Sequence, residues 1–194
     1  MNRNGNQCHS RTGRILLKMQ TIRDAIRTPA RALTRDVGPG DWKGELERWS
    51  LIGLIVDAVR TVDWPESDLK LTAQVGFTFR PLLMLTILTY CHATGVNRSK
   101  EIELTTRQDE VLRSFCTGSY PTWREIEDFR RSHRELICQS LAVVLRRARR
   151  CPGKFSICRS GGRSFNASKP SDFVRDADAR IQQAIFLDAM AVEA

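Results

Sequence analysis

Closely spaced metal ligands are scarce in this sequence. Its 194 residues contain three histidines and six cysteines, and no two cysteines form a Cys-x-x-Cys pair. The neighbours Cys91 and His92 would point about 100° apart on a helix, which is not the spacing of two ligands of one metal. These absences argue against a zinc site and against a disulfide framework, and we expect no metal ion and no other cofactor.

Long apolar runs are also missing. No run approaches the roughly 18 residues that a membrane span needs. The N-terminus lacks the apolar core and small-residue cleavage site of a signal peptide. We therefore expect a cytoplasmic protein with no membrane partner.

Acidic residues are too few to balance the basic ones. There are 31 lysines and arginines against 22 aspartates and glutamates, which gives a formal net charge of +9. A charge of this size on a small chain favours polyanionic partners, nucleic acid before anionic lipid. The hydrophobic fraction of 41% and the charged fraction of 27% are ordinary for a globular protein, so we expect a folded core.

No segment alternates apolar and polar residues over a useful length, so the sequence predicts an all-α fold. Apolar residues recur every three or four positions from Asp41 to just before Trp64, and a second apolar helix should run from Pro81 to Gly95. We expect short helices over 97–106, capped by Ser99, and over 109–116.

The next helix is predicted to begin at Thr122. Thr122 and Glu125 have the spacing of a capping box, in which each side chain accepts a backbone hydrogen bond at the start of the helix. The apolar positions that follow keep a helical period as far as Leu145. We expect one continuous helix that ends in the basic run Arg146 to Arg150, where positive charge suits the helix dipole.

Composition divides the chain into four segments. Residues 1–40 form a basic arm that we expect to be flexible, 41–150 a compact helical domain with helix-turn-helix-like elements, 151–170 a loop, and 171–194 a C-terminal helix. Three interpretations of the arm stand equally: contact with phosphates, a solvated tail, or an upstream stretch translated from a mistaken start. The buried side of the last helix is predicted to hold Val174, Ala177, Ile181, Ile185 and Leu187.

Two stretches, "RPLLMLTILTYCHATGVNRSKEIE" and "DEVLRSFCTGSYPTWREIEDFRRSHREL", together resemble the InsH-type N-terminal domain of bacterial insertion-sequence transposases. The resemblance covers about residues 79–150. It is carried by Pro81, Thr94-Gly95, Ser99, Glu101-Ile102-Glu103, Asp109 to Phe115, Gly118, Pro121, Ile126 and Phe129-Arg130-Arg131. Where many relatives have Asp-His-Ser or Asp-His-Thr after the proline, this chain has Thr122-Trp123-Arg124.

The resemblance implies a helical domain that contacts DNA and precedes a ribonuclease-H-like catalytic domain. We expect that catalytic domain to be missing from this sequence, because a two-metal site needs carboxylates on adjacent strands and the residues after Arg150 read as a loop and one helix. The run "LIGLIVDAV", which contains Asp57, has helical spacing and predicts a core helix instead of a first catalytic strand. We expect no catalytic residues and no enzymatic activity.

The leading hypothesis is a transposase-related DNA-binding module. The predicted DNA contacts are Arg98, Lys100, Arg124, Arg131, Arg134, Arg146, Arg147, Arg149 and Arg150. For each of them the alternative is a solvated helix face with pairs such as Glu127 and Arg131. Two other functions remain open: a fragment or subunit of a split transposase completed by a separate catalytic chain, or an interaction or inhibitor protein that pairs with transposase. Self-association is a further open alternative.

Overall fold

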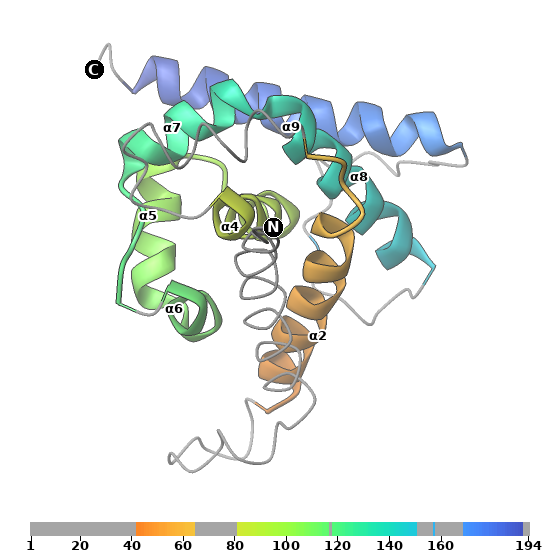
Figure 1. The fold of residues 1–194 in the computed structure, drawn as a ribbon, viewed down its shortest axis with the longest axis horizontal. Coiled ribbons are helices and arrows are strands. Elements are labelled where there is room, and N and C mark those ends of the chain that lie inside the picture. The colour runs from red at the N-terminus through yellow and green to blue at the C-terminus, as the bar shows by residue number, and fades with distance from the viewer. Residues whose placement is uncertain (1–41, 65–80, 117, 151–156, 158–168, 192–194) are drawn as a thin grey trace, which may run out of the picture. The chain divides into compact units, whose positions relative to one another are not determined.

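The computed structural model describes residues 42–64, 81–116, 118–150, 157 and 169–191. Its helices are α2 (Trp42–Val59), α4 (Pro81–Thr94), α5 (Ser99–Gln108), α6 (Glu110–Cys116), α7 (Trp123–Ser132), α8 (Arg134–Arg149) and α9 (Pro170–Met190) (Figure 1). No strand occurs among the described residues, which confirms the all-α prediction. The chain divides into two units, 1–45 and 46–194, and every helix from α4 onward belongs to the second. The predicted arm, 1–40, and nearly all of the predicted loop, 151–170, lie outside the described residues.

Helix α4 is the centre of the second unit. It begins at Pro81 and ends before Gly95, whose φ of 90° is a conformation that suits glycine, as the sequence predicts. Every residue from Met84 to Ala93 is buried, because α5, α6, α7 and α8 all pack against this helix. The buried hydroxyl of Thr89 donates to the Leu85 carbonyl at 2.7 Å and so remains hydrogen-bonded.

Helix α2 is mostly buried in its second half, as the spacing of its apolar residues predicts. Leu51, Ile52, Ile55 and Val59 are no more than 1% exposed. Asp57 lies in the same run but is exposed. The stretch "LIGLIVDAV" is therefore a core helix with one surface aspartate.

The start of α5 differs from the prediction. Ser99 is the first helical residue and not the cap, and Arg98 at the cap position makes no side-chain capping bond. The Ser99 backbone N–H donates instead to Asp188 Oδ1 at 2.8 Å, and the Ser99 hydroxyl donates to Oδ2 at 2.6 Å. The acceptor for this helix end thus comes from α9, a segment 89 residues further along the chain.

The single helix predicted from Trp123 to Arg150 is wrong. Its capping box is present, but the helix breaks at His133, where φ is −122° and ψ is 29°. The His133 ring stacks on Phe129 with ring centroids 4.3 Å apart. The break lets α7 pack against α5 while α8 packs against α4 and α9. Neither a proline nor a glycine lies at this break, and the apolar residues keep their helical spacing across it.

Helix α9 lies along α8 and also contacts α7 (Figure 1). Ala177 and Ile181 are buried as predicted, but Val174 is 50% exposed, which corrects the predicted buried side at that end. Two charged residues of α9, Arg180 and Asp188, are buried instead. No described helix is long and apolar enough to cross a membrane.

Candidate nucleic-acid interface

Basic and aromatic side chains meet where the N-terminal ends of α5 and α7 lie against each other. The Lys100 ammonium is 5.7 Å from the centroid of the Trp123 ring, and the Arg124 guanidinium is 5.1 Å from it. The Trp123 backbone N–H donates to Glu103 Oε2 at 3.0 Å, which fastens the first turn of α7 to α5. Because of this contact, cations from two helices approach one ring.

A second contact between a cation and an aromatic ring involves residues close in sequence to Trp123 and Lys100. Arg107 of α5 is 5.3 Å from the centroid of the Tyr120 ring. It also pairs with Glu103 at 3.0 Å, the residue that holds the start of α7. We call Lys100, Arg107, Tyr120, Trp123 and Arg124 the aromatic–basic surface. Its three cations are exposed, and both rings are half-buried.

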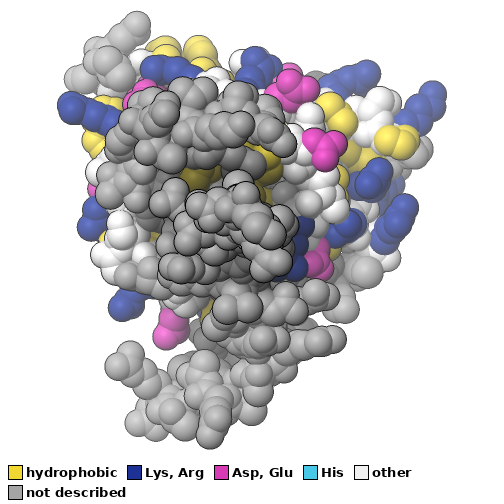
Figure 2. All heavy atoms as spheres, viewed as in Figure 1, with side chains coloured by type: hydrophobic (Ala, Val, Ile, Leu, Met, Phe, Trp, Pro, Cys, Tyr) yellow, Lys and Arg dark blue, Asp and Glu magenta, His cyan; other side chains and the backbone are white. Residues whose placement is uncertain are grey.

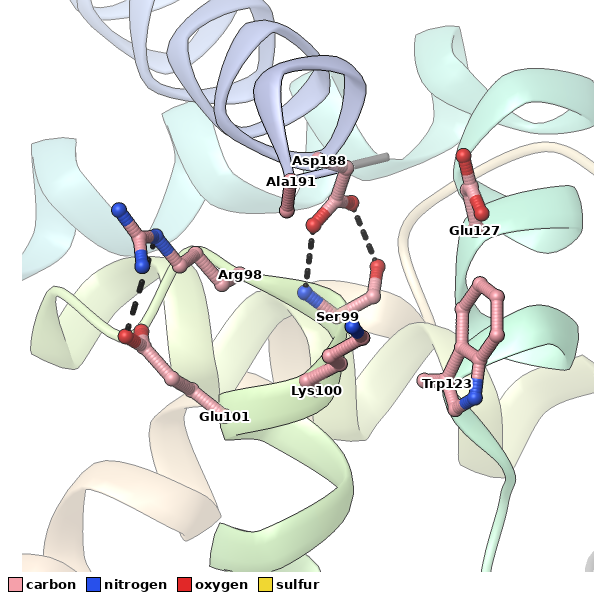
Figure 3. A pocket seen from close by; sticks show the side chains of 8 residues that line it. All are labelled: Arg98, Ser99, Lys100, Glu101, Trp123, Glu127, Asp188 and Ala191. Carbon is pink, nitrogen blue, oxygen red and sulfur yellow. Dashed lines mark hydrogen bonds and ion pairs between the residues drawn. The ribbon is translucent and has the colours of Figure 1, made fainter. Parts of the chain in front are cut away.

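A pocket of about 410 Å³ opens beside Trp123. In Figure 3 the Trp123 indole and Arg98 lie at opposite sides of it, and Asp188 reaches in from α9 between them. The residues that line it are Arg98, Ser99, Lys100, Glu101, Trp123, Glu127, Asp188 and Ala191. The pocket therefore combines the start of α5, the start of α7 and the end of α9.

One residue that lines the pocket, Asp188, belongs to a buried ion pair. Arg130 is fully buried and donates through Nη1 to Asp188 Oδ2. Its Nη2 donates to the Asn97 carbonyl at 2.9 Å. Burial lowers the pKa of Arg130, and the Asp188 carboxylate opposes that shift. Arg130 therefore holds α7 to the start of α5 and to α9, and it is not exposed to a ligand.

His92 lies in the same interior. Burial, with the neighbouring Arg130 charge as a second cause, lowers the pKa of His92 to about 3, so its ring is neutral near pH 7. Its Nδ1 is 3.2 Å from Asn97 Oδ1, and its carbonyl accepts from Arg180 Nη1 at 3.2 Å. His92 therefore joins α4 to the loop before α5 and to α9.

The nine predicted DNA contacts fall into three groups. Arg98, Lys100 and Arg124 lie together around the pocket and the Trp123 ring. Arg131 and Arg134 each have a carboxylate partner, Glu127 on α7 and Asp178 on α9. The last four lie at the C-terminal end of α8: Arg146, Arg147, Arg149 and Arg150.

Figure 2 shows lysine and arginine side chains on several sides of the face in view, not gathered in one patch. Sequence reasoning missed Arg107 and the two rings. The available signal was the pair of large aromatic residues, Tyr120 and Trp123, on either side of the predicted helix start.

The described residues contain no group of three histidine, cysteine, aspartate or glutamate side chains that could hold a metal ion. Cys91, Cys116 and Cys138 are buried free thiols, and burial raises the pKa of each. No protein-family model matches the chain, and comparisons with curated proteins and with solved structures found no match either. The resemblance to transposases thus rests on the sequence elements alone.

Proposed function

We propose that this chain is a transposase-related DNA-binding module without strand-transfer activity of its own. The observation that supports it most is the meeting of Lys100 and Arg124 at one ring. Both are exposed, and neither has a carboxylate partner among the described residues. A free cation on a helix start is the type of group that neutralises a DNA phosphate.

The ring contacts favour this function over a solvated helix face. A cation over an aromatic ring at the protein surface gains only about 0.5–1 kcal/mol and keeps its charge. Lys100 and Arg124 are therefore oriented without being neutralised. Arg131, by contrast, already pairs with Glu127, so it has less charge to offer a phosphate.

Two further features add to the positive field. Arg98 lies beside Lys100, and its only carboxylate partner among the described residues, Glu101, is 4.0 Å away. The arginines of the last turn of α8 form a separate basic end, which also suits the negative end of that helix dipole. We propose that these arginines attract DNA more weakly and independently of its sequence.

The test is a salt titration of duplex DNA binding by the wild type and by Lys100→Gln/Arg124→Gln. The slope of log affinity against log salt should fall by roughly 0.9 for each phosphate contact removed, so by about 1.8 for the pair. Glutamine has nearly the helix propensity of lysine and arginine, so the helices should persist. Circular dichroism checks that they do.

Arg131→Gln/Arg134→Gln is the matched control, because it removes the same formal charge from residues that already have carboxylate partners. We expect it to change the slope less. Equal slopes for the wild type and the Lys100/Arg124 variant would show that another part of the chain makes the contacts with DNA. Absence of binding by the wild type to both duplex and single-stranded DNA at low salt would refute the module itself.

A further inference from the structure

The pocket beside Trp123 is large enough to hold a small ligand or a single base. Its volume of about 410 Å³ falls within the roughly 300–1,000 Å³ of small-molecule pockets. One side is the flat Trp123 indole, and Lys100 approaches that ring to 5.7 Å. A ligand in this place meets an aromatic face and a positive charge together.

The charges around the pocket favour an anionic ligand in spite of its three carboxylates. Asp188 and Glu127 have close cation partners in Arg130 and Arg131, and Glu101 has Arg98 at 4.0 Å. Lys100 has no such partner among the described residues. The charge at the pocket without a partner is therefore that of Lys100, which is positive and lies next to the Trp123 ring.

The aromatic–basic surface continues this pattern away from the pocket. The Arg107 guanidinium lies over the ring of Tyr120. Tyr120 is three residues before Trp123, whose ring is approached by Lys100 and Arg124. Aromatic side chains interleaved with cations are the arrangement on which the successive bases and phosphates of a single strand bind. A paired base offers its face only to its stacked neighbours, so a ring of the protein can stack only on a base that has left the stack.

We propose that the pocket binds an unpaired base of a nucleic acid, stacked on Trp123, with the adjoining phosphate on Lys100. The strand then passes Arg124 and Tyr120 along the aromatic–basic surface. This inference rests on the proposed DNA-binding function and adds an unpaired strand as the preferred substrate.

The experiment measures the affinity of the full chain at low salt for three probes of equal length. These are a single-stranded oligonucleotide, the corresponding duplex, and an abasic strand that keeps the sugars and phosphates. The wild type is compared with Trp123→Leu, which removes stacking, and with Trp123→Tyr, which retains an aromatic ring. The thermal midpoint of each variant is measured as the folding control.

The wild type should bind the base-bearing strand about tenfold or more tighter than the abasic one. Trp123→Leu should lose about tenfold in single-strand affinity, with Trp123→Tyr close to the wild type, and it should lose clearly less in duplex affinity. Equal binding of the abasic strand, or equal losses on single strand and duplex, would overturn the inference. The abasic comparison uses the unaltered protein and so decides the matter even if Trp123→Leu is unstable.

The proposed function and this inference fail in different ways. Duplex binding without single-strand binding would overturn the stacking site and leave the DNA-binding module standing. If the wild type binds neither the single strand nor the duplex at low salt, both the proposed function and this inference are refuted.

Discussion

Substitution of Asp188 by alanine should destabilise this protein far more than the loss of an exposed carboxylate on the same helix. The Asp188 carboxylate accepts hydrogen bonds from the Arg130 guanidinium, from the Ser99 backbone N–H and from the Ser99 hydroxyl. The side chains of Arg130 and Asp188 are 1% and 10% exposed. Asp188→Ala therefore leaves a buried positive charge without a counter-charge and a helix start without an acceptor.

The expected loss follows from these two effects. Removal of one partner from a buried ion pair costs about 3–5 kcal/mol. Loss of an N-terminal helix acceptor costs about 1 kcal/mol. Domains of ordinary size have a free energy of unfolding of only about 5–15 kcal/mol. We therefore expect Asp188→Ala to lose about 4–6 kcal/mol, a large fraction of that stability.

Asp178→Ala is the matched control on the same helix. Asp178 pairs with Arg134 at 2.5 Å, but these side chains are 44% and 41% exposed, so water screens the pair. Its loss should cost no more than about 1 kcal/mol. A double variant, Arg130→Met/Asp188→Leu, should recover most of the stability lost in Asp188→Ala, since it removes both buried charges and keeps apolar volume.

The assay is urea unfolding followed by far-UV circular dichroism, with all variants at one protein concentration. The midpoint and the slope are fitted together, so that a change in stability is separated from a change in cooperativity. Equal losses for Asp188→Ala and Asp178→Ala would refute the argument, because they would show that the buried pair contributes no more than an exposed one.

Two further predictions concern the helix start of α7 and the buried histidine. Thr122→Ala removes the acceptor of the Glu125 N–H and should cost about 1 kcal/mol in urea unfolding, whereas Thr122→Ser should cost little. Burial lowers the pKa of His92 to about 3 in the folded protein, below its value of about 6.5 in the unfolded chain. Between these two values the unfolded chain binds more protons than the folded one. The free energy of unfolding therefore falls as the pH drops from 6.5 towards 3. At about pH 5 this amounts to about 2 kcal/mol. The pH dependence of the unfolding free energy should therefore weaken in His92→Gln, and parallel curves for variant and wild type would contradict the assignment.

Much of the helical framework could be predicted because its signals are local. Pro81 and Gly95 bracket α4, and the Thr122 and Glu125 side chains form the expected capping box. Each of these signals acts within a few residues of the chain. The break at His133 is different, because it depends on which neighbours α7 and α8 pack against.

The interior of the site could not be predicted for the same reason. Arg130 and Asp188 are 58 residues apart in sequence, and each looks like an ordinary surface charge on an amphipathic helix. Lys100 and Trp123 meet only because Glu103 holds the start of α7 against α5. Sequence reasoning found most of the cations of the aromatic–basic surface, and only the packing of the helices shows which of them meet at a ring.

The bond from Ser99 to Asp188 also bears on the order in which the protein matures on the ribosome. Domains begin to fold from the N-terminal side while the chain is still being synthesised. Here the residue that completes the start of α5 and neutralises Arg130 is made 89 residues after Ser99. Nascent chains that stop short of Asp188 therefore carry an interior guanidinium without its carboxylate. We expect such chains to stay open to proteases and chaperones until translation passes this residue.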